Sequence, residues 1–164
     1  MKVLFIGRFQ PFHNGHLNVI KYILKNYSEV IIGIGSSQYK DISKNPFSFD
    51  ERKKMIDNTL KFNNISNYKI IEIPDIHNPP KWVEHVLSIS SDFDIVVTNN
   101  SFTKKLFEEK GYDVISTPIF GKGEYSGKEI RKKIKIDGEW ESFVPKPAIE
   151  ILKRIDGIKR IKNI

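Results

Sequence analysis

Five short apolar runs alternate with stretches of helical periodicity along most of this chain. The apolar runs occupy residues 3–6, 29–34, 68–73, 93–98 and 113–117. Between them, apolar side chains recur with the period of one helix face in residues 16–27, 48–62, 81–89 and 102–110. Since strands and helices take turns, the pattern predicts an α/β fold in which five parallel strands form a doubly wound sheet with flanking helices.

The last part of the chain departs from this alternation. Ser126 and Glu129 have the spacing of a capping box, so a helix is expected to start there. Another amphipathic helix is expected over residues 145–155, and residues 158–164 form a basic and apolar tail. The sequence shows no internal repeat and no low-complexity segment, which predicts a single domain over residues 1–164.

Composition narrows the class of protein. The 164 residues include 27 Lys and Arg against 20 Asp and Glu, and the net charge of +7 suits an anionic partner such as a nucleotide. The chain has no cysteine, which excludes disulfides and thiol chemistry. Met1 leads into an apolar run without a basic leader, and no run approaches the length of a membrane span. We therefore expect a cytoplasmic protein without a membrane partner.

The first apolar run ends at Gly7 in a short loop that leads into the first helix. A strand, a loop and a helix in this order point the helix N-terminus at the carboxyl end of a buried strand, where α/β sheets bind anions. Arg8 offers a planar fork that matches a phosphate. His13 and His16 can donate hydrogen bonds to phosphoryl oxygens, and Gly15 lets a phosphate approach its backbone closely. The sequence therefore predicts a phosphate site in this loop.

The sequence gives less support to a structural zinc site and to a dinucleotide-binding site. A closed structural zinc site needs four ligands, whereas the chain has no cysteine and only His77 and His85 besides the first two histidines. The small residues after the second run, Gly33 to Gln38, lack the third glycine of a dinucleotide fingerprint and do not open a helix. Hydride transfer on a nicotinamide cofactor is therefore not expected.

The first loop resembles the Gly-x-x-x-Pro-x-His-x-Gly-His signature of the HxGH nucleotidyltransferases, since it reads Gly7-Arg8-Phe9-Gln10-Pro11-Phe12-His13-Asn14-Gly15-His16. Its Gly-Arg-Phe-Gln-Pro-Phe-His form is similar to that of the archaeal-type nicotinamide-nucleotide adenylyltransferases. The resemblance implies a Rossmann-like fold and the transfer of a nucleotidyl group from a nucleoside triphosphate. It also implies catalytic roles for His13 and His16 and assigns ATP binding to Gly7, Arg8, Phe9 and Gly15.

A second stretch resembles the same family. Residues 126–131 fit its Ser-x-x-x-x-Arg motif, which closes over the triphosphate opposite the first loop. The resemblance makes Arg131 a third catalytic residue and assigns ATP binding to Ser126, Glu129 and Ile130. A helix that starts after a glycine-containing loop would also have N-terminal amides free for a phosphate. Alternatively, Arg131 belongs to a basic solvent face with the lysines that follow it.

A third stretch, Asn45-Pro46-Phe47-Ser48 with Glu51-Arg52, resembles the family's Asn-Pro-Phe-(Ser/Thr)-x-x-Glu-Arg motif. In the family a basic residue before the Pro-Phe pair reaches the triphosphate. Here that residue is Lys44, which keeps the charge of an arginine and lacks its bidentate fork. The serine and glutamate of the motif also predict a capping box. Arg52 acts with the motif, or it is a helix-surface residue that pairs with a nearby acid.

The link after the third apolar run is expected to bind the acceptor. In the family, an Asp after this strand and a Trp some residues later line the nicotinamide pocket, which makes Asp75, Asn78 and Trp82 candidates. Ser37, after the second run, is a fourth. A tryptophan face suits a cationic pyridinium, and an amide or carboxylate suits its carboxamide. Trp82 has a second interpretation, as a core aromatic under the loop.

Together these resemblances imply an adenylyltransferase that joins ATP, with Mg²⁺, to nicotinamide mononucleotide and forms NAD and pyrophosphate. No metal ligand from the protein is predicted, and the relatives suggest a homo-oligomer such as a hexamer. One alternative is another HxGH enzyme that uses phosphopantetheine, FMN or a cytidylyl group. The other is a nucleic-acid-binding regulatory module. The chain has no reading helix or RNA-binding aromatic motif, so no nucleic-acid partner is expected.

Overall fold

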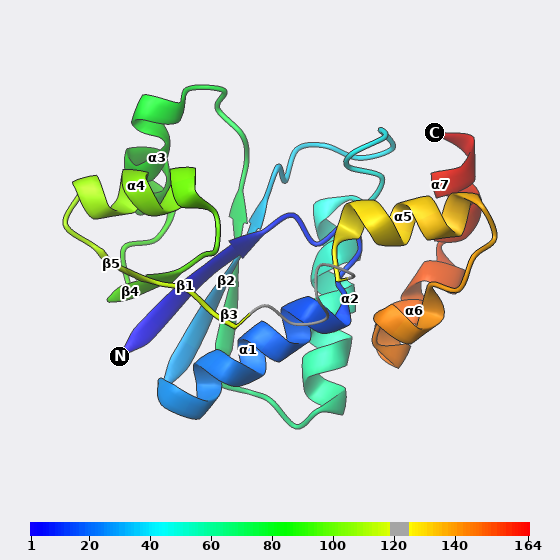
Figure 1. Cartoon of the computed structure of the whole chain (residues 1–164), viewed down its shortest axis with the longest axis horizontal. Coiled ribbons are helices and arrows are strands. Elements are labelled where there is room, and N and C mark those ends of the chain that lie inside the picture. The colour runs from blue at the N-terminus through cyan, green and yellow to red at the C-terminus, as the bar shows by residue number, and fades with distance from the viewer. Residues whose placement is uncertain (119–124) are drawn as a thin grey trace. The chain divides into compact units, whose positions relative to one another are not determined.

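The computed structural model describes residues 1–118 and 125–164 (Figure 1). The chain divides into two compact units, which we describe separately. The first unit contains Met1–Gly7, Ile20–Ser37 and Asn67–Pro118, and the second contains Arg8–Val19, Gln38–Ser66 and Ile119–Ile164. In neither described stretch is a helix long and apolar enough to cross a membrane. The single domain and the cytoplasmic location stay predictions.

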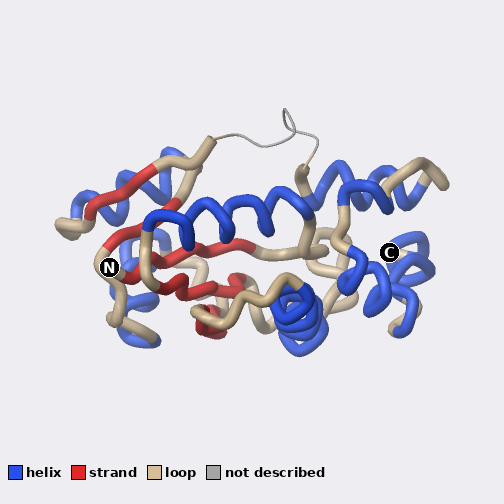
Figure 2. The backbone as a smooth tube through the Cα atoms, turned by 90° about the horizontal axis from the view of Figure 1, so that it is seen from below, coloured by secondary structure: helices blue, strands red, loops and turns tan. Residues whose placement is uncertain are grey.

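The first unit contains a five-stranded parallel sheet, coloured red in Figure 2. Its strands are β1 (Lys2–Gly7), β2 (Glu29–Gly35), β3 (Tyr68–Ile73), β4 (Ile95–Val97) and β5 (Asp113–Ile115), in the spatial order β3-β2-β1-β4-β5. Val3 of β1 pairs with Val30 on one side and with Ile95 on the other. The order reverses at β1, so the carboxyl ends of β1 and β4 form the switch point where such sheets bind ligands. The predicted parallel α/β sheet is confirmed.

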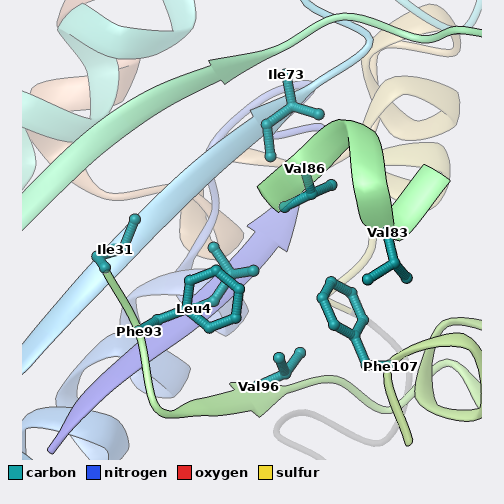
Figure 3. Packing of buried hydrophobic residues seen from close by; sticks show 8 residues of the cluster. All are labelled: Leu4, Ile31, Ile73, Val83, Val86, Phe93, Val96 and Phe107. Atoms are coloured by element: carbon teal, nitrogen blue, oxygen red, sulfur yellow. The ribbon is translucent and has the colours of Figure 1, made fainter. Parts of the chain in front are cut away.

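Two helices cover one face of this sheet, α3 (Trp82–Ile89) and α4 (Ser101–Glu109). Figure 3 shows Val83 and Val86 of α3 and Phe107 of α4 against the strand residues Leu4 and Val96. All five side chains are at most 2% exposed. Burying a side chain of this size is worth about 1.5 to 3 kcal/mol, so this apolar contact holds the helices on the sheet.

The second half of α1 (Asn14–Asn26) lies along the other face of the sheet (Figure 2). Side chains alternate between the two faces of a strand, so Phe5 and Ile32 point away from the α3 side. Ile20 and Ile23, in the part of α1 that belongs to this unit, are fully buried. Helices on both faces make the sheet doubly wound, as predicted.

The second unit is mostly helical. Its elements are α2 (Phe49–Phe62), α5 (Gly127–Lys135), α6 (Lys146–Arg154) and α7 (Gly157–Asn163). Helix α6 packs on α2, and α7 packs on both α5 and α6. Met55, Ile56, Ile151 and Leu152 are buried on these helices. The tail that the sequence left without a structure is therefore a helix, and Ile161 on its inner face is 2% exposed.

Of the two predicted capping boxes, the one at the start of α2 is fully formed. Ser48 and Glu51 form the expected capping box at α2, with the backbone N–H of Ser48 donating to Glu51 Oε1 at 2.9 Å and that of Glu51 donating to Ser48 Oγ at 3.2 Å. At α5 the described contacts include the serine half, in which the Glu129 N–H donates to Ser126 Oγ at 3.1 Å. The glycine-containing loop before Ser126 falls in residues 119–124, outside the described residues.

Strands β4 and β5 are shorter than predicted because hydrogen bonds from side chains replace the backbone ladder near their carboxyl ends. Beyond them, the backbone N–H of Thr117 donates to Asn99 Oδ1 at 3.0 Å, and Asn99 Nδ2 donates to Thr117 Oγ1 at 3.2 Å. Asn100 caps α4 by accepting from the Thr103 N–H at 2.9 Å. Asn100 therefore caps the helix, whereas Asn99 connects the end of β4 to the segment after β5.

Candidate active site

The loop that follows β1 is held in shape by side chains from other parts of the second unit. Gln10 Nε2 donates to the Phe47 carbonyl at 3.0 Å, and the Phe47 N–H donates back to Gln10 Oε1 at 2.9 Å. Arg52 Nη1 donates to the Arg8 carbonyl at 2.9 Å, and Arg131 Nη1 donates to the Gln10 carbonyl at 2.7 Å. Arg52 is fully buried, so its interpretation as a helix-surface residue is wrong.

His13 and His16 form a reciprocal pair at the start of α1. The backbone N–H of His13 donates to Nδ1 of His16 at 3.2 Å, and the backbone N–H of His16 donates to Nδ1 of His13 at 3.3 Å. The two imidazoles stack with ring centroids 3.5 Å apart. Because each Nδ1 accepts a hydrogen bond, the proton of each neutral ring lies on Nε2. Each ring therefore has its N–H donor on Nε2, a group of the kind that binds phosphoryl oxygens.

Burial keeps both imidazoles neutral. It lowers the pKa of His13 to about 4, and His13 is only 4% exposed. Burial also lowers the pKa of His16 well below its ordinary value, and the charge of a protonated His13 would lower it further. Phe9 and Phe12 contribute to this burial, with ring centroids 4.6 Å and 5.6 Å from that of His16.

The low pKa of His13 predicts a loss of stability in acid. An unfolded histidine takes up its proton near pH 6.5, whereas folded His13 does so near pH 4. The stabilisation is complete above pH 6.5 and is lost as the pH falls toward 4, by up to about 3 kcal/mol in the free energy of unfolding. His13→Asn keeps an acceptor near the Nδ1 position and removes the titration, so its stability should depend less on pH over this range in urea unfolding.

The matched control is His77→Asn, which removes an exposed histidine. It shows how much of the effect of His13→Asn comes from replacing any histidine by asparagine. An equal slope in the parent and in His13→Asn would contradict a buried, neutral His13.

The other predicted residues of this loop, Phe9, Gly15 and Gly7, are placed by packing and by the strand, and their roles in ATP binding stay predictions. Phe9 is 1% exposed and has a left-handed φ of 54°, so any contact with a nucleotide would come from its backbone. A Cβ on Gly15 would lie 2.6 Å from Tyr125 Cβ and 2.9 Å from His13 Cε1. Glycine is therefore required here by the packing of Tyr125 and His13, a reason that the sequence did not reveal. Gly7 is the last residue of β1 and lies in the first unit.

A strongly basic cavity of about 490 Å³ lies in the second unit. Of the predicted residues, it brings together Arg8, Lys44 and Arg131. Burial and the like charge of Arg8 lower the pKa of Arg131, although an arginine stays protonated at neutral pH. An anion in this cavity would relieve the repulsion between the two guanidinium groups.

Three lysines of α5 that the sequence did not assign to a site also line this cavity, namely Lys128, Lys132 and Lys135. Their spacing of three or four residues places them on one helix face with Arg131, which is the signal that could have identified them. Lys133 points elsewhere, with Nζ 5.2 Å from the ring centroid of Phe143. The basic residues of α5 therefore lie on two faces of the helix, one of which lines the cavity.

The N-terminal amides of α5 are only partly free. The N–H of Glu129 is bonded to Ser126 Oγ, and that of Ile130 donates to the Ser126 carbonyl at 3.0 Å. By helix geometry, the amides of Gly127 and Lys128 are the ones that a ligand can use. Ile130 is fully buried, so its side chain has no access to a nucleotide.

A second cavity, of about 270 Å³, lies in the first unit. It brings together the predicted residues Asp75, Asn78 and Trp82, and Phe102 of α4 lines it as well. Trp82 is half-buried, and its ring packs edge-on against Phe107 with centroids 5.7 Å apart. One side of Trp82 therefore contacts the core and another lines the cavity, and its role in acceptor binding stays a prediction.

The loop after β2 contributes a serine that the sequence did not single out. Ser36 Oγ donates to Asp75 Oδ2 at 2.7 Å and has a left-handed φ of 49°. The predicted Ser37 is 6% exposed, does not line this cavity, and its Oγ is buried without a hydrogen-bond partner among the described residues. Ser36 therefore orients the Asp75 carboxylate, and the role of Ser37 stays a prediction.

The sequence is similar to those of proteins from a known family. Residues 4–133 match the cytidylyltransferase-like family. The chain is 43% identical over 163 residues to a nicotinamide-nucleotide adenylyltransferase of Thermoplasma volcanium, covering 99% of this chain and 92% of that protein. It is 45% identical over 164 residues to one of Methanococcus aeolicus, covering 100% and 95% of the two chains.

A solved structure shares the fold. It is a bifunctional NMN adenylyltransferase/ADP ribose pyrophosphatase from Francisella tularensis in complex with AMP and a manganese ion, with a TM-score of 0.80 and 27% identity. The match covers 99% of this chain and 52% of the other, so this chain spans about half of that bifunctional protein. Since the family match covers most of the sequence and the relatives align from end to end, the chain belongs to the cytidylyltransferase-like family and, within it, to the nicotinamide-nucleotide adenylyltransferases.

Proposed function

We propose that this protein transfers the adenylyl group of ATP to nicotinamide mononucleotide, forming NAD and pyrophosphate as a step of NAD biosynthesis. The observation that carries the proposal is the histidine pair with its Nδ1 atoms fixed as acceptors. Two neutral Nε2–H donors suit phosphoryl oxygens, and Arg131 links their loop to the basic cavity by its bond to the Gln10 carbonyl.

The chemistry needs no nucleophile from the protein. The 5′-phosphate of the mononucleotide is an anion and can attack the α-phosphate of ATP in line. Catalysis then comes from positioning and from stabilising charge on the α-phosphate and the leaving pyrophosphate. We assign the α-phosphate to the Nε2–H donors of His13 and His16. Arg131 and the other cations of the basic cavity bind the β- and γ-phosphates.

We further propose that Mg²⁺ enters as part of the substrate, MgATP. Magnesium binds phosphate oxygens together with water and few protein ligands. Residues 1–118 and 125–164 contain no group of three or more His, Cys, Asp or Glu that could hold a metal ion. Phosphate oxygens are therefore assigned as the main ligands of the cation.

The cavity of the first unit is assigned to the nicotinamide end of the acceptor. Its volume of about 270 Å³ and its aromatic residues suit a pyridinium ring, with the cation over the indole of Trp82. Asp75 and Asn78 provide acceptors for the carboxamide N–H groups. A neutral carboxamide is favoured beside the Asp75 carboxylate.

An acceptor panel tests the proposed function. The parent protein is incubated with MgATP and one acceptor at a time, and pyrophosphate release is measured. Nicotinamide mononucleotide should give the highest kcat/KM. Faster turnover of phosphopantetheine or FMN would assign the chain to another branch of the superfamily, and salt-sensitive binding of DNA or RNA without transfer would indicate a regulatory module.

We expect Trp82→Ala to raise the KM for nicotinamide mononucleotide by about five- to thirtyfold, because a partly desolvated cation–π contact is worth about 1 to 2 kcal/mol. The KM for ATP should stay nearly unchanged. Steady-state kinetics with each substrate varied measures both values. The thermal midpoint should fall as well, since the same ring packs on Phe107.

The control for the tryptophan is a matched pair of milder changes. Trp82→Phe should raise the acceptor KM, whereas Trp140→Phe, which alters a buried tryptophan of the second unit, should not. A lower midpoint with an unaltered acceptor KM in Trp82→Ala would assign Trp82 to the core alone.

We also propose a homo-oligomer, which is what the resemblance of the first loop to the archaeal-type enzymes implies. Light scattering on the purified chain measures its mass in solution. A monomer at micromolar concentration would reject this part of the proposal.

A further inference from the structure

A tight turn presents Lys44 to the basic cavity. The backbone N–H of Asp41 donates to the Pro46 carbonyl at 3.1 Å, and inside this bond Ile42 and Asn45 exchange hydrogen bonds of 3.3 Å and 2.9 Å. Ser43 and Lys44 lie at the tip, and both line the cavity. Both are exposed, so the position of the lysine ammonium depends on the backbone of the turn. We call residues 41–46 the Lys44 turn.

Arg160 of α7 contacts both ends of this turn. Its Nη1 donates to the Pro46 carbonyl at 3.1 Å, the same oxygen that accepts from Asp41. Its Nε lies 3.5 Å from Asp41 Oδ1. Arg160 does not line the basic cavity itself. It can therefore influence an anion in the cavity only through the turn.

The guanidinium group of Arg160 is held in place by Glu51. Its Nη1 and Nη2 donate to the two carboxylate oxygens at 2.6 Å and 2.9 Å, a bidentate pair. Burial alone would raise the pKa of Glu51, but hydrogen bonds from Arg160 and Ser48 outweigh it, and the pKa is lowered. The group also lies over the Phe47 ring, 5.7 Å from its centroid. A lysine could not make these contacts together, because it lacks the planar fork.

We infer that Arg160 is a positioning residue for ATP, which acts by fixing the Lys44 turn. The inference rests on one part of the proposed function, the binding of the triphosphate by Lys44, and does not depend on the acceptor. It gives the basic C-terminal helix a role that neither its charge nor its amphipathic pattern indicated. Without Arg160, the turn keeps its internal backbone bonds but loses its anchor to α2 and α7, and ordering it on ATP binding then costs conformational entropy.

The test is a double-mutant cycle on ATP affinity. MgATP is titrated into the protein without acceptor, and the dissociation constant is measured by calorimetry. Arg160→Ala should weaken binding by about tenfold, because the bond from the Lys44 ammonium to the triphosphate would be largely lost, and a hydrogen bond from a charged group is worth about this much. In a Lys44→Ala background the same change should have almost no further effect. Equal weakening in both backgrounds would overturn the inference, because Arg160 would then act independently of Lys44.

Two further variants separate positioning from charge and from folding. Lys159→Ala removes an exposed charge from the same helix and should leave ATP affinity unchanged. Arg160→Lys keeps the charge and loses the bidentate contact, so it should weaken binding nearly as much as alanine does. If Arg160→Ala does not fold, the cycle is measured with Arg160→Lys. Full affinity in Arg160→Lys would contradict a role for the guanidinium geometry.

A second measurement reports on the turn directly. Amide hydrogen exchange of residues 41–45 should be faster in Arg160→Lys, with the β-sheet amides unchanged. Unchanged exchange in the turn would also overturn the inference. Because calorimetry needs no transfer reaction, a parent that binds ATP but fails the acceptor panel would reject the proposed function and leave the inference on Arg160 standing.

Discussion

His16→Asn is expected to lower kcat about 100- to 1000-fold, the usual cost of removing one donor that stabilises transition-state charge. Asparagine can place its amide oxygen near the Nδ1 position and so keep the bond from the His13 N–H, while it lacks the Nε2–H. His16→Gln has the opposite property, because its amide nitrogen reaches the Nε2 position. The glutamine variant should therefore retain more activity than the asparagine variant.

Single-turnover measurements with saturating MgATP and nicotinamide mononucleotide isolate the chemical step for this pair. Calorimetric ATP affinity should change far less than the rate, since the donor acts mainly on charge that develops in the transition state. Rates within twofold of the parent in both variants would remove His16 from the mechanism. The reverse order, with asparagine more active than glutamine, would assign the role to Nδ1.

Arg131→Ala should lower kcat/KM for ATP about 100-fold, because it removes a cation from the triphosphate site and the bond to the Gln10 carbonyl together. Arg131→Lys should recover only part of this loss, since a lysine restores the charge without the guanidinium geometry. Initial rates at varied ATP and saturating acceptor measure both effects.

The matched control is Arg154→Ala, which removes an exposed arginine of α6 and should leave kcat/KM unchanged. Lys133→Ala serves the same purpose within α5, because Lys133 lies over Phe143 and not in the cavity. An effect of Lys133→Ala as large as that of Arg131→Ala would indicate a general effect of charge, contrary to a specific site.

The sheet was predictable because its information is local. Apolar runs such as residues 29–34 are long enough to identify buried strands, and their alternation with helices implies parallel order. The first loop was predictable because its residue types are unusual at that spacing. Trp82 shows the limit of this approach, since an aromatic after a strand suits a core and a pocket equally, and the structure places it at the boundary of both.

The remaining features depend on contacts between distant residues. Nothing in the sequence indicates that Arg160 meets Glu51, 109 positions away, or that Gln10 pairs with the backbone of Phe47. Burial also excluded one of the two interpretations of Arg52, because this residue is not on the helix surface but donates to the Arg8 carbonyl in the interior. A hydrogen bond from a side chain to a distant backbone carbonyl produces no local sequence pattern, so it could not be predicted.

The hydrogen bonds that hold the first loop come from distant segments, which makes the loop difficult to graft onto another protein. Carbonyls of Arg8 and Gln10 are occupied by Arg52 and Arg131, and the Gln10 side chain is paired with Phe47, so the shape of the loop is encoded largely outside it. A graft of residues 7–16 onto another scaffold would carry both histidines without these supports. Transfer of the proposed phosphate site to a new protein therefore requires three separate segments of the chain, the loop itself and the segments that contain Phe47 with Arg52 and Arg131.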